Sequence, residues 1–470
     1  MTQDVTKDFV SNFWDTAVMP TLKQYVSIPC KSQSFDANWQ QSGFFDEAIN
    51  LLTQWMRAQN LPGLQVETVR LENYAPCVYA EIPGHTGKTV MFYGHLDKMP
   101  EATGWREDLD PWKPVVEGDK LYGRGSVDNG YSLFSAITAI KCLQAQNLPH
   151  DRYVIVLECA EESGSIGFPH YLEYLKDRID NPSLIVVLDA GGSDYERLWL
   201  TASLRGLLLG RLRVDLLKNS IHSGVGGGAV ASTFRIARQL LNRIEDMYTG
   251  DILIKSANVE IPDDRTEQAK FMAKVLGDRI YEDFPMLEGC KLMHDVGHEV
   301  LLSRSWRPSL SVIGADGLPT LENAGNALRP FTTLMLGMRL PPCCEAQKVI
   351  QDLKQTLENE PPYGAKVSFT PTAAVDGWAA PKMRASMENM ISDASLKYFG
   401  EEPVYAGCGG SIGTVKLLGD TFKNAQFFIS GAEGPDSNAH GPNEYLHIPV
   451  AKNITSAMAQ ILMQYAKNNE

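Results

Sequence analysis

The chain has no long apolar segment and no excess of positive charge. None of its apolar runs approaches the roughly 18 residues that a membrane-spanning helix needs. Its 470 residues include 57 acidic and 43 basic side chains, which gives a formal charge of -14, so the molecule repels polyanions. We therefore expect neither a nucleic-acid partner nor an anionic membrane as a partner.

Signals for disulfide bonding and for export are also missing. The eight cysteines are scattered without C-x-x-C spacing, which argues against a disulfide framework and against a cysteine zinc site. Near the start, acidic residues stand where a signal peptide has a basic flank, and no apolar segment follows them. The sequence therefore predicts a cytoplasmic protein.

Short apolar runs alternate with helical patterns in the first two hundred residues. Runs at 88–94, 153–160 and 183–190 have the length of buried strands, and helical patterns at 129–146 and 170–179 separate them. This alternation predicts an α/β fold with a mostly parallel sheet flanked by helices.

The pattern changes near Arg205 and returns near Trp378. The length corresponds to roughly three domain-sized units, or to one large domain with an insertion. Between the two positions, strands and helices are arranged as in a separate α+β unit. We therefore predict a first α/β part at 1–205, an inserted α+β domain at 206–374 and a second α/β part at 375–470.

Ionisable residues follow each of the three predicted strands. His95 and Asp97 end the first strand, Glu161 and Glu162 follow the second, and Asp189 follows the third. In open α/β sheets, ligands bind at the carboxyl ends of the strands. We therefore expect these side chains to meet at one edge of the sheet.

Two further candidates lie in glycine-containing loops, Asp128 in G-R-G-S-V-D and His440 in H-G-P-N-E. Two imidazoles and three carboxylates suit a site for two metal ions, in which one carboxylate bridges ions about 3.5–4 Å apart. By contrast, His294 and His298 lack the H-E-x-x-H order and enclose Gly297, so we expect a solvated loop there.

The motifs occur in a characteristic order, G-H-x-D, G-R-G-x-x-D, E-E-x-G-S, D, H-S-G, G-G-S and H-G-P-N-E. This series resembles the dizinc metallopeptidase family of carnosinase, cytosolic non-specific dipeptidase, glutamate carboxypeptidase, aminoacylase and acetylornithine deacetylase, over nearly the whole chain. The resemblance implies a zinc-exopeptidase-like catalytic domain, an inserted lid domain, and a homodimer formed through the lid.

The resemblance also implies roles for individual residues. It gives two divalent ions, Zn²⁺ or alternatively Mn²⁺ or Co²⁺, the following ligands: His95, Asp128 and Asp189 for one ion, and Asp128, Glu162 and His440 for the other. Asp97 then lies beside His95, where its carboxylate can accept the imidazole N–H. Glu161 is left as the general base.

Residues of the inserted domain are given substrate contacts by the same resemblance. His222 would reach the active site from the partner subunit and help to hold the oxyanion. Arg339 and the loop that contains Gly410 and Ser411 would grip the carboxylate of the substrate, a task that suits a guanidinium fork and backbone N–H groups.

Two positions depart from the family pattern. Lys98 stands where the family usually has valine, and we expect a lysine near the metals to alter the charge at the rim of the site. After Asp128 the usual lysine is missing, because the chain continues with Asn129 and Gly130. We expect the start of the following helix to be reshaped.

We expect a cytoplasmic, metal-dependent hydrolase that cleaves the peptide bond of a small substrate with a free carboxylate. The carnosinase-like length and the H-G-P-N-E loop favour a dipeptide. Hydrolysis of N-acyl amino acids at the same metals remains open, since the sequence does not separate the two. A metal-binding scaffold without activity is a third possibility, against which the presence of Glu161 beside a full ligand set speaks.

Overall fold

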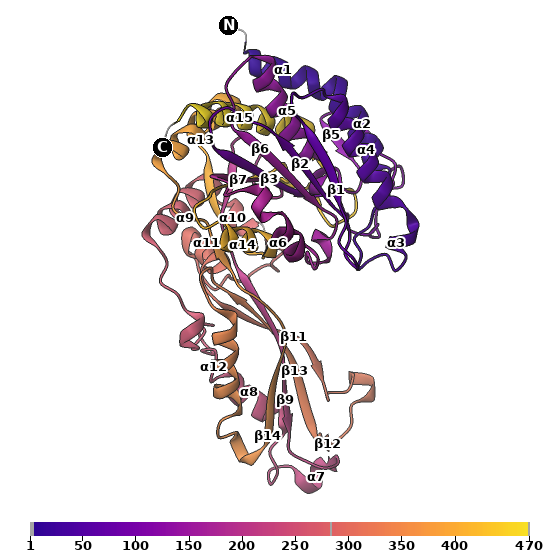
Figure 1. Ribbon diagram of the computed structural model, residues 1–470. Coiled ribbons are helices and arrows are strands. Elements are labelled where there is room, and N and C mark those ends of the chain that lie inside the picture. Colours follow the sequence, from indigo (N-terminus) through magenta and orange to yellow (C-terminus); the bar gives the residue numbers. More distant parts are fainter. Residues whose placement is uncertain (1–3, 283, 469–470) are drawn as a thin grey trace. The chain divides into compact units, whose positions relative to one another are not determined.

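The computed structural model describes residues 4–282 and 284–468, which form two compact units. The first comprises Met1–Thr201, Ala380–Tyr405 and Leu417–Glu470, and the second Ala202–Ala379 and Ala406–Lys416 (Figure 1). The predicted third segment, 375–470, is thus divided between the units, because residues 406–416 pack with the second one.

A six-stranded sheet forms the centre of the first unit, in the order β1-β2-β6-β3-β7-β17. Its strands are β1 (Gln65–Val69), β2 (Cys77–Ile82), β3 (Thr89–His95), β6 (Arg152–Glu158), β7 (Leu184–Val187) and β17 (Gln426–Ile429). The last four run parallel, whereas β1 and β2 are antiparallel to their neighbours. The predicted α/β fold with a mostly parallel sheet is confirmed, and every residue of β3 and β7 is buried.

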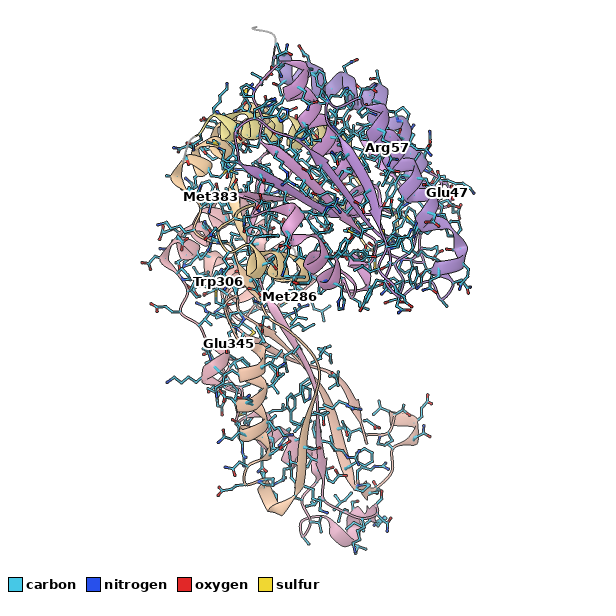
Figure 2. All side chains as sticks on the ribbon, viewed as in Figure 1. Glu47, Arg57, Met286, Trp306, Glu345 and Met383 are labelled. Atoms are coloured by element: carbon cyan, nitrogen blue, oxygen red, sulfur yellow. The ribbon has the colours of Figure 1, made fainter. Side chains whose placement is uncertain are left out.

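Helices cover both faces of this sheet. They are α1 (Val5–Phe13), α2 (Met19–Val26), α3 (Trp39–Ser42), α4 (Phe44–Ala58), α5 (Tyr131–Ala145), α6 (Phe168–Ile179), α13 (Ala385–Tyr398) and α15 (Ile448–Lys467), with the helical turns η1 (Trp14–Val18), η2 (Ser126–Gly130) and η3 (Glu161–Ser163). The amphipathic spacing of α4 buries Phe45, Ile49 and Met56 and leaves Glu47 and Arg57 on its outer side (Figure 2).

Alternate residues of each strand point to opposite faces of the sheet. On one face, Phe92 and Ile155 join a core that includes residues of α1, α4, α5, α13 and α15. On the other face, the ring of Tyr93 contacts that of Phe168 in α6, with centroids 5.2 Å apart. Because both faces are covered, the strands are apolar throughout.

A small antiparallel sheet brings distant segments of the first unit together. It consists of β4 (Val115–Glu117), β5 (Lys120–Tyr122) and β18 (Tyr445–His447). Tyr445 pairs with Tyr122, and the N–H of Gly123 donates to the main-chain oxygen of Glu444 at 3.0 Å. This pairing places the H-G-P-N-E loop beside the loop that leads to Asp128.

The second unit contains an antiparallel sheet in the order β11-β13-β9-β14. These strands are β9 (Gly206–Asp215), β11 (Ser309–Asp316), β13 (Phe331–Leu340) and β14 (Lys366–Val375). One face packs against α8 (Thr233–Leu241) and α12 (Ala346–Glu358), with Leu212, Leu336 and Val349 in the core. In β11, at the edge of this sheet, Val312 and Ile313 are about half exposed.

The remaining elements follow in chain order. They are β8 (Trp199–Leu204), β10 (Ile221–His222), α7 (Ser223–Gly226), η4 (Lys255–Ala257), α9 (Asp263–Leu276), α10 (Arg279–Glu282), α11 (Gly297–Ser305), η5 (Leu321–Asn323), β12 (Ala327–Leu328), η6 (Pro362–Gly364), β15 (Trp378–Ala379), β16 (Val404–Cys408) and α14 (Gly413–Thr421). None of the helices in the described ranges combines the length and the apolar character needed to cross a bilayer.

Candidate metal centre

The parallel strands bring the predicted ligands to one edge of the sheet. His95 is the last residue of β3, Glu162 lies in η3 just after β6, and Asp189 comes two residues after the end of β7. Asp128 lies in η2, directly before α5, and the peptide bond that follows it is cis. His440 lies in the loop before β18.

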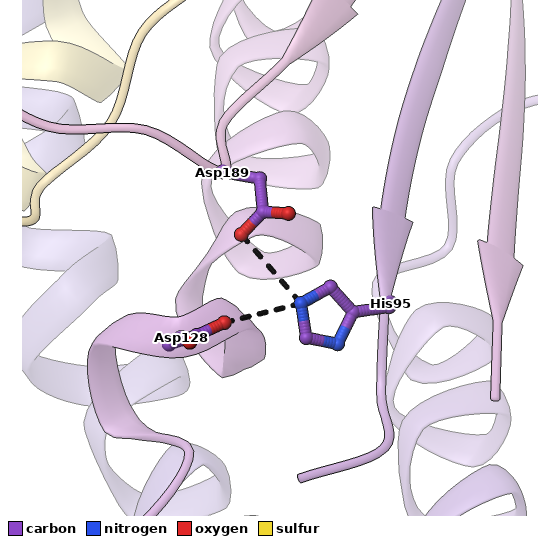
Figure 3. A group of neighbouring side chains, drawn as sticks. All are labelled: His95, Asp128 and Asp189. Atoms are coloured by element: carbon purple, nitrogen blue, oxygen red, sulfur yellow. Dashed lines mark hydrogen bonds and ion pairs between the residues drawn. The ribbon is translucent and has the colours of Figure 1, made fainter. Parts of the chain in front are cut away.

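Two groups of three side chains form at this edge, and Asp128 belongs to both. Nε2 of His95 lies 3.1 Å from Oδ1 of Asp128 and 3.5 Å from Oδ1 of Asp189 (Figure 3). Nε2 of His440 lies 2.9 Å from Oδ2 of Asp128 and 3.1 Å from Oε2 of Glu162. Within each group the possible ligand atoms lie within 4.8 Å of one another.

This donor set fits two metal ions. The two oxygens of Asp128 face different groups, which is the geometry of a bridging carboxylate. Oε1 of Glu162 is buried and has no hydrogen-bond partner among the described residues, so it is available to a cation. Imidazole nitrogens and carboxylate oxygens suit zinc, manganese or cobalt better than a soft metal.

The site strongly favours positive charge between its carboxylates. Hydrogen bonds with Asp128 and Glu162 raise the pKa of His440 to about 11. Burial would lower the pKa of His95, but Asp189 and Asp128 raise it well above its usual range. For Asp128, burial alone would raise the pKa, yet the hydrogen bonds with His440 and His95 lower it. Divalent cations would be stabilised by the same carboxylates.

Glu161 and Glu162 differ in their contacts. Burial and the charge of Asp128 raise the pKa of Glu162 to about 7, although His440 opposes the shift. Burial raises the pKa of Glu161 well above its usual range, with contributions from Asp189 and Glu162. Glu162 contacts His440, whereas Glu161 belongs to neither group of candidate ligands.

Asp97 contacts His95 and also the turn that follows β6. Nδ1 of His95 lies 3.0 Å from the main-chain oxygen of Asp97 and 3.5 Å from its carboxylate, so the main-chain oxygen is the nearer acceptor. The carboxylate also accepts the N–H groups of Glu161 and Glu162, both at 3.1 Å. Asp97 therefore supports the turn that contains both glutamates.

Three residues without an assigned role organise the site. Nδ2 of Asn129 donates to Oδ1 of Asp189 at 2.7 Å and to the oxygen of Leu188 at 2.8 Å, so the shortened motif after Asp128 supports a candidate ligand. Arg124 and Glu444, both buried, form an ion pair of 2.7 Å. The sequence could have indicated Arg124 and Glu444, because both lie in the glycine-containing loops of candidate ligands.

The ion pair joins the loops of two candidate ligands. Oε1 of Glu444 accepts the N–H groups of Gly125, Val127 and Asp128 at 3.0, 3.2 and 3.3 Å. Nη2 of Arg124 donates to the oxygen of Gly441 at 2.8 Å, next to His440. The loops before Asp128 and after His440 are thereby linked.

Glu433 is a further acidic residue near the metal centre. Burial, together with the charges of Asp128 and Asp189, raises its pKa to about 7. Its main-chain oxygen accepts the N–H of Gly192 at 2.8 Å, which ties it to the loop after Asp189. Nothing in its sequence motif indicated this position, because the contact depends on the fold.

The expectation that Lys98 alters the charge at the rim is wrong. Its side chain is completely buried, and its ammonium donates to the main-chain oxygens of Tyr25, Val26 and Ile28 at 2.8, 3.2 and 2.8 Å. These oxygens lie at the C-terminal end of α2, where unpaired carbonyls attract a cation. Lys98 therefore stabilises this helix end.

The predicted substrate residues all lie in the second unit. Nδ1 of exposed His222 accepts the N–H of Gly224 at 3.1 Å, so in the neutral ring Nε2 has the proton and can donate. Among the described residues, the guanidinium of Arg339 makes no hydrogen bond or ion pair. The N–H of Gly410 donates to Sγ of Cys408 at 3.4 Å, and Ser411 donates to the oxygen of Arg205.

The segment with His294 and His298 is not entirely the loop that we expected. Helix α11 begins at Gly297 and includes His298, since glycine costs little at a helix start. His294 lies before the helix and belongs to neither group of candidate ligands.

Comparison with known proteins identifies the family. The chain is 24% identical to a cysteinylglycine-S-conjugate dipeptidase of Corynebacterium striatum over 384 residues, 81% of each chain. It is 26% identical to a human Beta-Ala-His dipeptidase over 442 residues, 91% of this chain and 86% of the relative. The structure of the metallo-carboxypeptidase Sso-CP2 from Sulfolobus solfataricus has the same fold, with a TM-score of 0.73, 22% identity and coverage of 96% and 99%. Residues 91–464 match peptidase family M20/M25/M40, and this confirms the resemblance: the chain belongs to that family.

Proposed function

We propose that this protein is a dipeptidase that uses two divalent metal ions, with Asp128 as the bridging ligand. The observation behind the proposal is that the two oxygens of Asp128 face separate groups, one with His95 and one with His440. The dipeptidases among its relatives support the substrate class. The ligands we propose are His95 and Asp189 for one ion, Glu162 and His440 for the other, and Asp128 for both.

Zinc is the metal we propose, with manganese or cobalt as alternatives. Two such ions lower the pKa of a water molecule and polarise the scissile carbonyl. Asn129 would hold Asp189 in its ligand orientation, and the main-chain oxygen of Asp97 would keep the proton of His95 on Nδ1, leaving Nε2 for the metal.

Glu161 is the proposed general base. It takes a proton from the attacking water and returns it to the nitrogen of the leaving amine. Its N–H is held by the carboxylate of Asp97 at 3.1 Å, which supports a defined position.

Arg339, Gly410 and Ser411 are proposed to bind the carboxylate of the substrate. The unpaired guanidinium of Arg339 is suited to a bidentate contact with a carboxylate. Glu433 supports a dipeptide over an N-acyl amino acid, because burial beside Asp128 and Asp189 raises its pKa to about 7, and the α-ammonium group of a dipeptide would stabilise its charged form.

We further propose a cytoplasmic homodimer formed through the second unit. The edge strand β11 of its sheet exposes Val312 and Ile313, and exposed apolar side chains on a sheet edge are suited to an interface. In such a dimer, His222 of the partner subunit would donate from Nε2 to the oxyanion.

The decisive experiment measures metal content and hydrolysis together. The purified protein is loaded with Zn²⁺, Mn²⁺ or Co²⁺ and assayed on a panel of dipeptides and the matching N-acetyl amino acids. We expect two ions per chain and faster hydrolysis of dipeptides. Preferential hydrolysis of N-acetyl amino acids would favour the alternative function, and two bound ions without any hydrolysis would favour a metal-binding scaffold.

The variant Glu161→Gln completes this experiment. It should keep both metals and lose kcat by a factor of at least about 10²–10⁴, since only the base is removed. Near-normal activity of this variant would show that Glu161 is not the base.

A further inference from the structure

Arg205 lies between β8 and β9 and is bonded to the loop that follows β16. Its main-chain N–H donates to the oxygen of Cys408 at 3.2 Å, and its own main-chain oxygen accepts the hydroxyl of Ser411. Nε of its guanidinium donates to the oxygen of Gly409 at 3.3 Å. One residue thus holds three of the four positions 408–411, and all of them belong to the second unit.

The side chain of Arg205 also packs closely against this loop. A Cβ atom at position 409 would lie 3.2 Å from Nη2 of Arg205, which is closer than an ordinary van der Waals contact. Glycine at this position therefore allows the guanidinium and the backbone of the loop to approach each other. Because Arg205 is half-buried, water competes less for its bonds than it would at the surface.

The other end of the guanidinium reaches a neighbour of Arg339, the proposed anchor of the substrate carboxylate. Nη1 of Arg205 donates to the main-chain oxygen of Ser303 at 3.3 Å and to Oγ of Ser309 at 3.5 Å. Ser309 in β11 is directly opposite Arg339 in β13, and residues in that relation have neighbouring side chains on one face of a sheet. Arg205 therefore links the loop at 408–411 to the strand beside Arg339.

The two guanidinium groups are close enough to influence each other. Burial, together with the positive charge of Arg339, lowers the pKa of Arg205 to about 10. Arg205 is still charged at neutral pH, so it has two properties that could matter to a bound carboxylate: its charge and its hydrogen bond to the loop. A test of its role has to separate them.

We propose that Arg205 is a positioning residue, which fixes the loop at 408–411 beside Arg339 so that both can hold the carboxylate of the substrate. The bond that carries this role runs from Nε to the oxygen of Gly409. A carboxylate is held well only when its partners have a defined geometry, and a misplacement of about 1 Å can cost about a hundredfold in rate. The proposal rests on the proposed dipeptidase function and on the carboxylate contacts proposed for Arg339 and this loop.

Three variants separate the hydrogen bond from the charge. Counted along the side chain, Nε2 of glutamine stands at the same place as Nε of arginine, so Arg205→Gln keeps a donor toward Gly409 and removes the charge. Arg205→Met has a methyl group at that place and removes both. Arg205→Lys keeps the charge but has no donor there.

The measurement is kcat/KM of the metal-loaded enzyme for Ala-Ala and for Ala-Ala amide. We expect the wild type to prefer Ala-Ala by at least about tenfold. Arg205→Met should bring this ratio close to one, and Arg205→Gln should keep more of it than Arg205→Lys. Hydrolysis of the amide should be unchanged in all three variants, a result that a general loss of structure would not give. Arg211→Met removes a charge from an exposed position of β9 and should keep the full ratio.

Three results would overturn the positioning role. A full ratio in Arg205→Met would show that the loop does not depend on this side chain. Equal losses for Ala-Ala and its amide would show that Arg205 serves the structure in general. A ratio that survives in Arg205→Lys and is lost in Arg205→Gln would show that the charge of Arg205 attracts the substrate directly.

These results differ from a failure of the proposed function. Absence of hydrolysis of every dipeptide would refute the dipeptidase. Hydrogen exchange followed by mass spectrometry would then still decide whether Arg205 holds the loop. Exchange at residues 408–413 should be faster in Arg205→Met than in the wild type and in Arg205→Gln, and equal exchange in all three proteins would overturn the positioning role.

Discussion

The buried pair of Arg124 and Glu444 gives the sharpest test of how the candidate metal centre is held. The change we consider is Glu444→Gln, which keeps the shape of the side chain and removes its charge. In the native protein this carboxylate accepts one bond from Arg124 and three from backbone N–H groups. A glutamine has one acceptor oxygen, so either Arg124 or the backbone groups would face an amide NH₂.

The cost can be worked out from this geometry. Arg124 is 1% exposed and Glu444 is completely buried, so the variant leaves a buried guanidinium without its counter-charge. Breaking such a pair costs about 3–5 kcal/mol, against a total stability of about 5–15 kcal/mol for a folded domain. We expect the free energy of unfolding to fall by that amount, and the affinity for the metal held by Asp128 and His440 to fall with it.

Urea denaturation and metal titration measure the two effects. Glu173→Gln is a suitable control, because the Glu173 side chain is 72% exposed and pairs with Lys176 at the surface. The double variant of Glu444→Gln and Arg124→Met should lose less stability than the two single variants added together, since neither buried charge remains. Unchanged stability and metal affinity in Glu444→Gln would refute the argument.

Three other outcomes follow from the candidate site. Asp128→Ala should abolish binding of both metals, whereas Asp189→Ala should leave about one ion per chain, as measured by elemental analysis; equal losses would exclude a bridge. Arg339→Ala should remove the preference for dipeptides with a free carboxylate over amidated ones, which we expect to be at least about tenfold in kcat/KM in the wild type. Mixing His222→Ala with Glu161→Gln should restore part of the activity if subunits exchange, because one site of the mixed dimer would have both native residues; an active monomer in ultracentrifugation would contradict this.

The sequence predicted the parts of the fold that local pattern determines. The strands β3, β6 and β7 were evident because a sheet covered on both faces needs continuous apolar runs. The strand β1 was missed, since Gln65–Val69 is short and lacks the continuous apolar run of the other three strands. The segment 406–416 was placed in the wrong unit because its packing depends on residues far away in the chain.

For the site, the residue types at the strand ends were predictable, but their hydrogen bonds were not. His95 and Asp189 follow apolar strands, so their meeting at one edge follows from parallel topology. By contrast, Arg124 and Glu444 are 320 positions apart, and their pairing depends on the register of a small sheet. The carboxylate of Asp97 lies near His95 as predicted, but its hydrogen bonds to the N–H groups of Glu161 and Glu162 depend on the folded turn.

The contact between buried Lys98 and the end of α2 is also long-range, and the pH dependence of stability can test it. Burial lowers the pKa of Lys98 from 10.5 to about 8 in the folded protein, whereas in the unfolded chain it stays near 10.5. Below pH 8 both states are protonated, and the cost of the buried charge is fully present. Between pH 8 and 10.5 the folded protein loses this proton while the unfolded chain keeps it, so the free energy of unfolding rises with pH.

The size of the effect follows from the shift. At about 1.4 kcal/mol for each pKa unit, the wild type should gain about 3 kcal/mol relative to Lys98→Met between pH 7 and pH 10.5. Urea denaturation of both proteins across this range measures the difference, and Lys382→Met, at an exposed position, controls for the loss of a charge. A difference that stays constant with pH would mean that the three carbonyl groups and the ring of Tyr25, 4.1 Å from the ammonium, stabilise the charged form enough to offset its burial.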